Sequence, residues 1–283
     1  KRKDFGIFIS GNITRLMGFN LRGGIRYTFA DTRAFSDDVY RTRSTNSPSL
    51  FLGIVKKFSD KISLFFNTGT SFRNPSLSES YYTGITGRKY VTGNPDLDPE
   101  KSLNIDTGIK LHSGNLFLGF YMFQNNIKDM IERYRIENGS YTYNNIDSGK
   151  ISGAETEFQW FPSPNLELFS HFNYYYGRSV KTDDPLNDIP SPKLFAGGKV
   201  NLGKSWLEMN LLHSFKKTDP GPSEIENNSY NLVTIKGGHY FSSKFFAFIK
   251  ISNILNNNFF PNPDPDIPEN DGINITAGMN FFF

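Results

Sequence analysis

The sequence has no cysteine among its 283 residues. This absence excludes disulfide frameworks, thiolate metal sites and cysteine nucleophiles. A strong charge imbalance is also missing, because 31 Lys and Arg residues face 28 Asp and Glu residues and leave a net charge of +3. So small and dispersed an excess gives no argument for a nucleic-acid partner. We therefore expect none.

Long apolar runs are absent too. The longest, Leu116 to Phe123, is only about eight residues, whereas a membrane helix needs about twenty. Spanning helices are thereby excluded, but spanning strands are compatible with the mean hydropathy of −0.45, because they alternate apolar and polar residues. The first residues, 1–6, lack the apolar core and cleavage site of a signal peptide. We expect that a signal was removed or that the chain starts inside a larger protein.

The sequence does have a period-two alternation of apolar and polar residues, which is typical of β-strands with one apolar face. From Phe19 to Phe29, Leu21 and Ile25 alternate with Arg22 and Arg26. The pattern recurs and predicts about thirteen strands, near residues 5–13, 18–30, 49–58, 61–72, 101–111, 116–131, 144–161, 165–177, 192–202, 206–215, 229–241, 244–253 and 272–283.

The connections between these segments alternate in length. Short turns fall near residues 13–17, 59–60, 112–115, 162–164, 203–205 and 242–243, and long connections fall between them, at 31–48, 73–100, 132–143, 178–191, 216–228 and 254–271. Tight periplasmic turns and long extracellular loops are typical of outer-membrane barrels. Most predicted strands also meet the roughly 9 to 11 residues that a tilted strand needs to cross a bilayer.

Side-chain chemistry supports a membrane barrel. Aromatic residues near predicted strand ends suit interfacial girdles, namely Trp160, Phe161, Tyr174 to Tyr176, Trp206 and Phe281 to Phe283. The charged residues of the polar faces need a watery lumen or partners, namely Arg22, Arg26, Asp106, Lys110, Glu155, Glu157 and Lys199. Because an open sheet edge is not viable in lipid and bacterial barrels have even strand numbers, about thirteen strands predict a fragment of a larger barrel.

Several segments carry a family resemblance. They are 71–79 (SFRNPSLSE), 93–100 (GNPDLDPE), 125–131 (NNIKDMI), 151–157 (ISGAETE), 252–255 (SNIL) and the terminal Phe283. In this order they resemble the boxes of TonB-dependent outer-membrane receptors, although Asn74 stands where the family usually has Ala. The resemblance implies an all-β fold, a transmembrane antiparallel β-barrel of twenty-two strands filled by a plug. Residues 1–283 are then its C-terminal thirteen strands, with the plug and the first nine strands missing.

The resemblance also implies a function. Such a receptor is no enzyme: it lies in the bacterial outer membrane, contacts its lipid, and takes up a scarce metal chelate when TonB acts on the plug. We expect a ferric siderophore as the ligand, with cobalamin as the alternative. Phe281 and Phe283 resemble the signal read by the barrel-assembly machinery, and they are equally the last lipid-facing residues of the strand. No cofactor and no resident metal site are expected.

Candidate ligand contacts lie in the long connection after residue 72. Tyr81, Tyr82, Arg88, Lys89 and Tyr90 combine aromatic rings with positive charge, which suits aromatic, negatively charged chelates. Ordinary solvated loop residues are an equal alternative. Arg73 ends the preceding strand, where it holds an anionic ligand or a plug carboxylate, or serves a structural role. The two prolines of segment 93–100 favour a stiff connector without ligand contact.

Four other hypotheses are weaker. An outer-membrane enzyme needs a Ser or Asp beside a rim His, and neither His171 nor His213 has an identifiable partner. A soluble all-β binding domain would bury the faces that we assign to lipid. The resemblance also counts against haem as the ligand. Haem receptors of this family normally carry a His between the two segments 71–79 and 93–100, and residues 75–93 contain none. The Asp-rich segments 183–188 and 264–271 lack the spacing of an EF-hand calcium loop.

Overall fold

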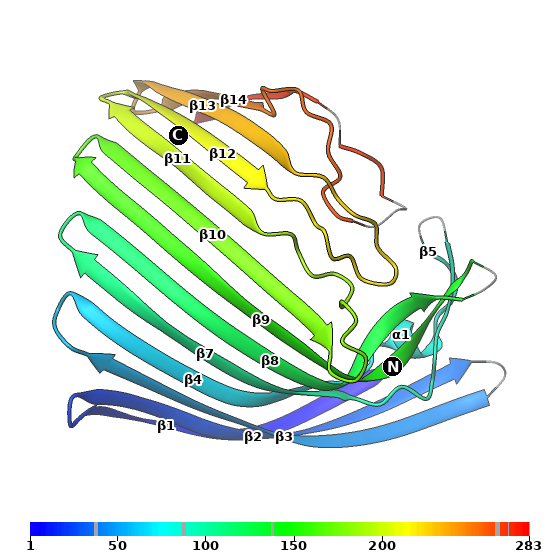
Figure 1. Cartoon of the computed structure of the whole chain (residues 1–283). Coiled ribbons are helices and arrows are strands. Elements are labelled where there is room, and N and C mark those ends of the chain that lie inside the picture. Colours follow the sequence, from blue (N-terminus) through cyan, green and yellow to red (C-terminus); the bar gives the residue numbers. More distant parts are fainter. Residues whose placement is uncertain (37–38, 87–88, 137–138, 264–266, 271, 283) are drawn as a thin grey trace.

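The computed structural model describes residues 1–36, 39–86, 89–136, 139–263, 267–270 and 272–282. They form one curved, almost entirely antiparallel sheet (Figure 1). The main path of this sheet contains thirteen consecutive strands in sequence order, each hydrogen-bonded to the next. Their bounds are β1 Arg2–Leu16, β2 Phe19–Ser36, β3 Val39–Lys57, β4 Ile62–Arg73, β7 Glu100–Ser113, β8 Leu116–Arg135, β9 Tyr141–Ser163, β10 Leu166–Ser179, β11 Lys193–Leu202, β12 Ser205–Ser214, β13 Tyr230–Ser242, β14 Phe245–Ser252 and β15 Asn274–Phe281.

The predicted all-β sheet is therefore confirmed. The predicted short turns all lie at one end of the sheet, on the left of Figure 1, and the other connections lie at the opposite end, on the right. Within the described residues, β1 and β15 each pair on one side only, so the sheet is open. No helix among the described residues is long and apolar enough to cross a membrane.

Two predicted long loops are wrong. Residues 31–48 are mostly strand, since β2 and β3 stay paired as far as Ser36 and Val39. Residues 132–143 likewise continue β8 and β9, which pair as far as Arg135 and Tyr141. These segments lack the apolar alternation of the bilayer-crossing part, because the ribbons project beyond it into water and do not need a greasy face.

The register assigns the two faces of the sheet. Leu21 lies opposite Ile54 and then Phe66, whereas Arg22 lies opposite Gly53 and then Asn67, which lies opposite Asp106. All the charged residues predicted for the lumen share the second face, because pairing continues in register through β12. On the first face Ile25 is 45% exposed and Met279 69%, so the molecule's own interior does not cover these apolar side chains.

Two of the girdle aromatics are placed wrongly by the sequence. Tyr174 and Tyr176 share the apolar face, but Tyr175 points the other way and its hydroxyl donates to Glu155, 2.7 Å away. Trp206 lies opposite Asn201 and Gly238 on the polar face. Its indole ring fills the space beside Gly238, where a Cβ would lie only 2.6 Å from Nε1. When both faces of a strand carry apolar residues, the sequence pattern cannot show which aromatic side chain faces the lipid.

Candidate ligand-binding loop at the outer rim

The connection between β4 and β7 has structure of its own. A short helix, α1 (Leu77–Tyr81), is followed by a hairpin of β5 (Thr83–Thr86) and β6 (Lys89–Thr92). Ser76 caps the helix with a capping box: its hydroxyl accepts from the Glu79 amide at 3.1 Å, and its own amide donates to the Glu79 carboxylate at 2.7 Å. Because Pro75 precedes this cap with a fixed φ, the sequence NPSLSE starts a helix directly after the strand.

Arg73, at the end of β4, ties this helix to the next long strand. Its Nε and Nη2 donate to the two carboxylate oxygens of Glu100 at 2.6 and 2.9 Å. Its Nη1 donates to the carboxylate of Glu79 at 2.9 Å. A planar guanidinium matches such a bidentate carboxylate well. The strand before the loop, the helix inside it and the strand after it therefore meet at one side chain.

The hydrogen bonds of this cluster favour the charged forms of Arg73 and Glu79. Hydrogen bonds to Glu100 and Glu79 raise the pKa of Arg73 further above its already high value, although partial burial opposes this. Burial of Glu79 acts to raise its pKa, but the hydrogen bonds from Ser76 and Arg73 outweigh it, and the pKa of this carboxyl lies below its usual value. Arg73 and Glu79 are thus both charged at neutral pH.

Glu100 connects the cluster to a third segment. Its Oε1 also accepts the backbone N–H of Ile131 at 2.7 Å. Ile131 ends the 125–131 segment on β8, and it follows Asp129, whose φ of +54° marks an irregularity in that strand. The segments 71–79, 93–100 and 125–131, far apart in sequence, therefore converge at the outer rim. We call this group of Arg73, Glu79, Glu100 and the Ile131 amide the rim cluster.

The 93–100 segment is fixed independently against β9. The Asn94 amide group donates to the carbonyl of Tyr143 at 2.9 Å. The Asn145 side chain accepts from the Asp98 amide at 2.7 Å and donates to the carbonyls of Asp98 and Asp129 at 3.0 and 2.6 Å. Leu97 between them is fully buried. These contacts are those of a stiff connector.

The hairpin stands on this anchored base. β6 pairs in parallel with the projecting part of β9, Val91 lying opposite Tyr141, and Val91 is almost fully buried. The other side of the hairpin is open: Ile85 and Tyr90, which lie opposite each other, are 70% and 48% exposed, and Tyr82, directly before β5, is 40% exposed. The Tyr82 hydroxyl donates to the Ile85 carbonyl at 2.9 Å, which fixes this ring against the start of the hairpin. The loop therefore presents an aromatic and aliphatic surface on a rigid support.

The predicted site residues are only partly brought together. Tyr90 lies on β6 and Tyr82 directly before β5, both exposed, while Tyr81 is half-buried at the end of α1. Arg73 lies at the base, with two carboxylates of its own chain around its guanidinium. Lys89 begins β6, and Arg88 lies outside the described residues. A ligand contact by any of them stays a prediction.

The predicted assembly signal lies at the other end of the chain. Phe281 is the last residue of β15, and its ring stacks on Phe245 of β14 with centroids 4.7 Å apart. Phe283 lies outside the described residues. Phe281 shares the apolar face with Met279. Its role in recognition by the assembly machinery also stays a prediction.

Two structural contacts escaped the sequence reasoning. Arg43 of β3 pairs with Asp98 at 2.9 Å and also donates to the Leu97 carbonyl, so the projecting ribbon clasps the loop. Lys217 and Glu224, each only 5% exposed, form an ion pair at 2.5 Å between β12 and β13. Because loop residues follow no periodic pattern, the sequence does not indicate which glutamate pairs with which lysine. Among the described residues, no group of three or more His, Asp or Glu side chains could hold a metal ion.

Comparison with known proteins identifies the architecture. Residues 1–268 match the family model described as TonB dependent receptor-like, beta-barrel. The chain belongs to the TonB-dependent receptor family. Members of this family are outer-membrane β-barrels, so the predicted localisation and the resemblance are confirmed, and the exposed apolar face of the sheet is the lipid-facing one.

Individual relatives show what this TonB-dependent receptor chain is similar to. It is 32% identical over 129 residues to the vitamin B12 transporter BtuB of Vibrio vulnificus, an alignment that covers 45% of this chain and 20% of BtuB. The structure of the copper transporter OprC superposes with a TM-score of 0.87 at 15% identity, covering 99% of this chain and 47% of OprC.

A third relative is the ferric enterobactin receptor PfeA of Pseudomonas aeruginosa. Its structure matches with a TM-score of 0.79 at 16% identity, over 100% of this chain and 45% of PfeA. The chain therefore spans less than half the length of the relatives it matches. At such identities the two superpositions show the fold alone.

Proposed function

We propose that this chain forms part of the wall and outer mouth of an energy-coupled receptor that takes up a ferric siderophore. In this proposal the barrel residues bind the chelate and form the scaffold that positions the binding loops. TonB acts through a plug encoded outside residues 1–283, and the chain carries out no covalent chemistry. Cobalamin is the second candidate, since BtuB is a vitamin B12 transporter.

The observation that carries the proposal is the exposed hairpin at the outer rim. Tyr82 and Tyr90 are exposed on a loop whose base is fixed by the rim cluster. A rigid aromatic surface binds a planar aromatic ligand at a small cost in ordering. In sequence, Arg88 and Lys89 directly precede Tyr90, and their positive charge complements the negative charge of a ferric catecholate.

A binding assay on the complete receptor tests this proposal. Ferric enterobactin and cyanocobalamin are titrated separately against the detergent-purified protein, with intrinsic fluorescence as the readout. The double variant Y82A/Y90A is expected to weaken binding of the ferric catecholate about tenfold, since each aromatic contact contributes about 0.5 to 1.5 kcal/mol. Tyr240, similarly exposed but at the short-turn end, supplies the control variant Y240A.

The outcomes separate the candidates. Tight binding of ferric enterobactin that depends on the hairpin supports a siderophore. Binding of cyanocobalamin alone replaces it with the second candidate. An unchanged affinity in Y82A/Y90A removes the hairpin from the binding site, and failure of both ligands to bind contradicts both candidates.

A further inference from the structure

Three lysines stand out on the lipid-facing surface of the sheet. Lys101 of β7 and Lys128 of β8 lie directly opposite each other. Lys150 of β9 lies two residues along from Ser148, which is the partner of Lys128. All three belong to the face that carries Leu103 and Met122, and all three are exposed. We call this group the lysine patch.

The patch lies at the outer edge of the membrane. Lys150 is about ten residues from Trp160, and Lys101 about ten from Leu111, both at the short-turn end of their strands. Ten residues of a strand tilted by about 40° cover about 25 Å of depth, the height of the apolar band of a barrel. The ammonium groups therefore lie at the depth of the outer-leaflet headgroups.

The positive charge of the patch is not compensated by the protein. Like charges directly opposite each other on neighbouring strands are destabilising. Within the part of the chain that the structure describes, no ion pair joins Lys101, Lys128 or Lys150 to a carboxylate. Arg178 lies opposite Lys150, but its guanidinium already pairs with Asp219 and donates to the Tyr176 hydroxyl at 2.9 Å. An anion from outside the protein would relieve this repulsion.

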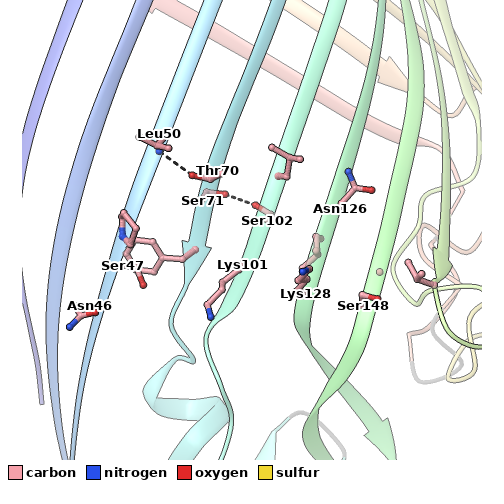
Figure 2. A pocket seen from close by; sticks show the side chains of 16 residues that line it. Asn46, Ser47, Leu50, Thr70, Ser71, Lys101, Ser102, Asn126, Lys128 and Ser148 are labelled. Atoms are coloured by element: carbon pink, nitrogen blue, oxygen red, sulfur yellow. Dashed lines mark hydrogen bonds between the residues drawn. The ribbon is translucent and has the colours of Figure 1, made fainter.

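An apolar groove begins beside the patch. Pairing of β3 with β4 ends at Phe51 and Gly69, and beyond it the Leu50 amide donates to the Thr70 hydroxyl at 3.1 Å. The strands part there and leave a cavity of about 810 Å³. Lys101 and Lys128 border it, as Figure 2 shows. Its apolar lining on this face comes from Leu50, Phe72 and Leu103, with Val180 beside them.

We propose that the lysine patch and this groove bind a phosphorylated lipid of the outer leaflet. Its phosphates lie between the three ammonium groups, and an acyl chain follows the groove. The chemistry of the two parts selects this occupant: three cations at headgroup depth require an anion, and the apolar cavity next to them requires a hydrocarbon. The site lies outside the lumen and on the face opposite to that of the transported ligand.

Native mass spectrometry of the complete receptor in detergent tests the proposal. The probe is diphosphoryl lipid A, compared with phosphatidylcholine and inorganic phosphate. The triple variant K101Q/K128Q/K150Q is expected to lower the affinity for lipid A at least tenfold, because each surface lysine contributes about fivefold to attraction by anionic lipid. The control is K110Q/K199Q/K250Q, which removes the same charge from the lumen face.

Heat-modifiable migration in a gel checks that both variants fold. Lipid A binding that is lost in the patch variant and kept in the control supports the site. Equal binding by the patch variant and the parent protein overturns it. Displacement of lipid A by millimolar inorganic phosphate also overturns it, since the site is then specific for free phosphate. If the patch variant does not fold, the single variants K101Q and K128Q are compared in the same assay.

Discussion

Arg73 and Glu100 lie on neighbouring strands and face each other through two parallel hydrogen bonds of 2.6 and 2.9 Å. Since the same guanidinium also holds Glu79, the pair fixes both ends of the structured loop that carries the exposed hairpin. The rim cluster is thus a support for the candidate site. Support of this kind allows a loop to keep its shape without a large core of its own.

Replacing Arg73 with Lys is expected to loosen the hairpin while the barrel stays intact. A single ammonium cannot bond both carboxylates in the same geometry, and Glu79 and Glu100 are then left facing each other. Because the cluster is partly exposed, the loss is about 1 kcal/mol, or about a fivefold rise in local opening. Hydrogen exchange of the Val91 and Thr92 amides measures it. Unchanged exchange would show that the contacts with β9 suffice.

The hairpin is also expected to loosen in acid. The pKa of Glu79 in the folded protein lies below its usual value, because Ser76 and Arg73 donate hydrogen bonds to the carboxylate, so this carboxylate stabilises the loop at higher pH. This stabilisation is lost as the pH falls through the folded pKa, in the window below 4.5. Hydrogen exchange between pH 3 and 6 is expected to show this transition in the parent and to lack it in E79Q. A transition that persists in E79Q would assign it to another group.

Glu132 is expected to behave with the opposite sign. It lies beyond the membrane-spanning part of β8, and burial together with Asp188 and Glu224 raises its pKa. Its Oε1 is buried without a hydrogen-bond partner. Its neutral form is thus favoured in the folded state, and stability is lost as the pH rises through the folded pKa.

The variant E132Q removes this charge. We expect slower exchange around Asn187 at pH 7 than in the parent, and equal exchange at pH 4, where the parent carboxyl takes up a proton. The conservative E132D keeps the charge and serves as the control. Faster exchange in E132Q at pH 7 would mean that the carboxylate stabilises the loops.

Gly153 is expected to tolerate no side chain. A Cβ there would lie 2.5 Å from the Phe123 ring and 2.7 Å from the Tyr174 carbonyl, so a valine forces ring and backbone apart at a cost of about 1 to 3 kcal/mol. Heat-modifiable gel migration measures the folded fraction of G153V. Gly11, with nothing within 4 Å of its Cβ position, supplies the control G11V. Equal folding of the two variants would show that the ring moves away freely.

The sequence predicted the sheet better than the site. Period-two alternation located all thirteen main-path strands, because each must present one face to lipid. It failed for the projecting ends of β2 and β8, where water on both faces removes that requirement. It also could not find the Glu100 contact with the Ile131 amide, since a backbone donor leaves no trace in residue identity. Arg73 was chosen from its position at the strand end, and its two carboxylate partners appear only in three dimensions.

The central claim is that the Leu103 face of the sheet contacts acyl chains and the Asp106 face contacts a watery interior. Nitroxide labels placed singly at residues 103 to 110 of the complete receptor in lipid vesicles test it most directly. Oxygen accessibility is expected to peak at Leu103, Ile105 and Ile109, while a water-soluble nickel reagent reaches Asn104, Asp106 and Lys110. Equal nickel accessibility on both faces, or an oxygen peak at Asp106, would contradict the account.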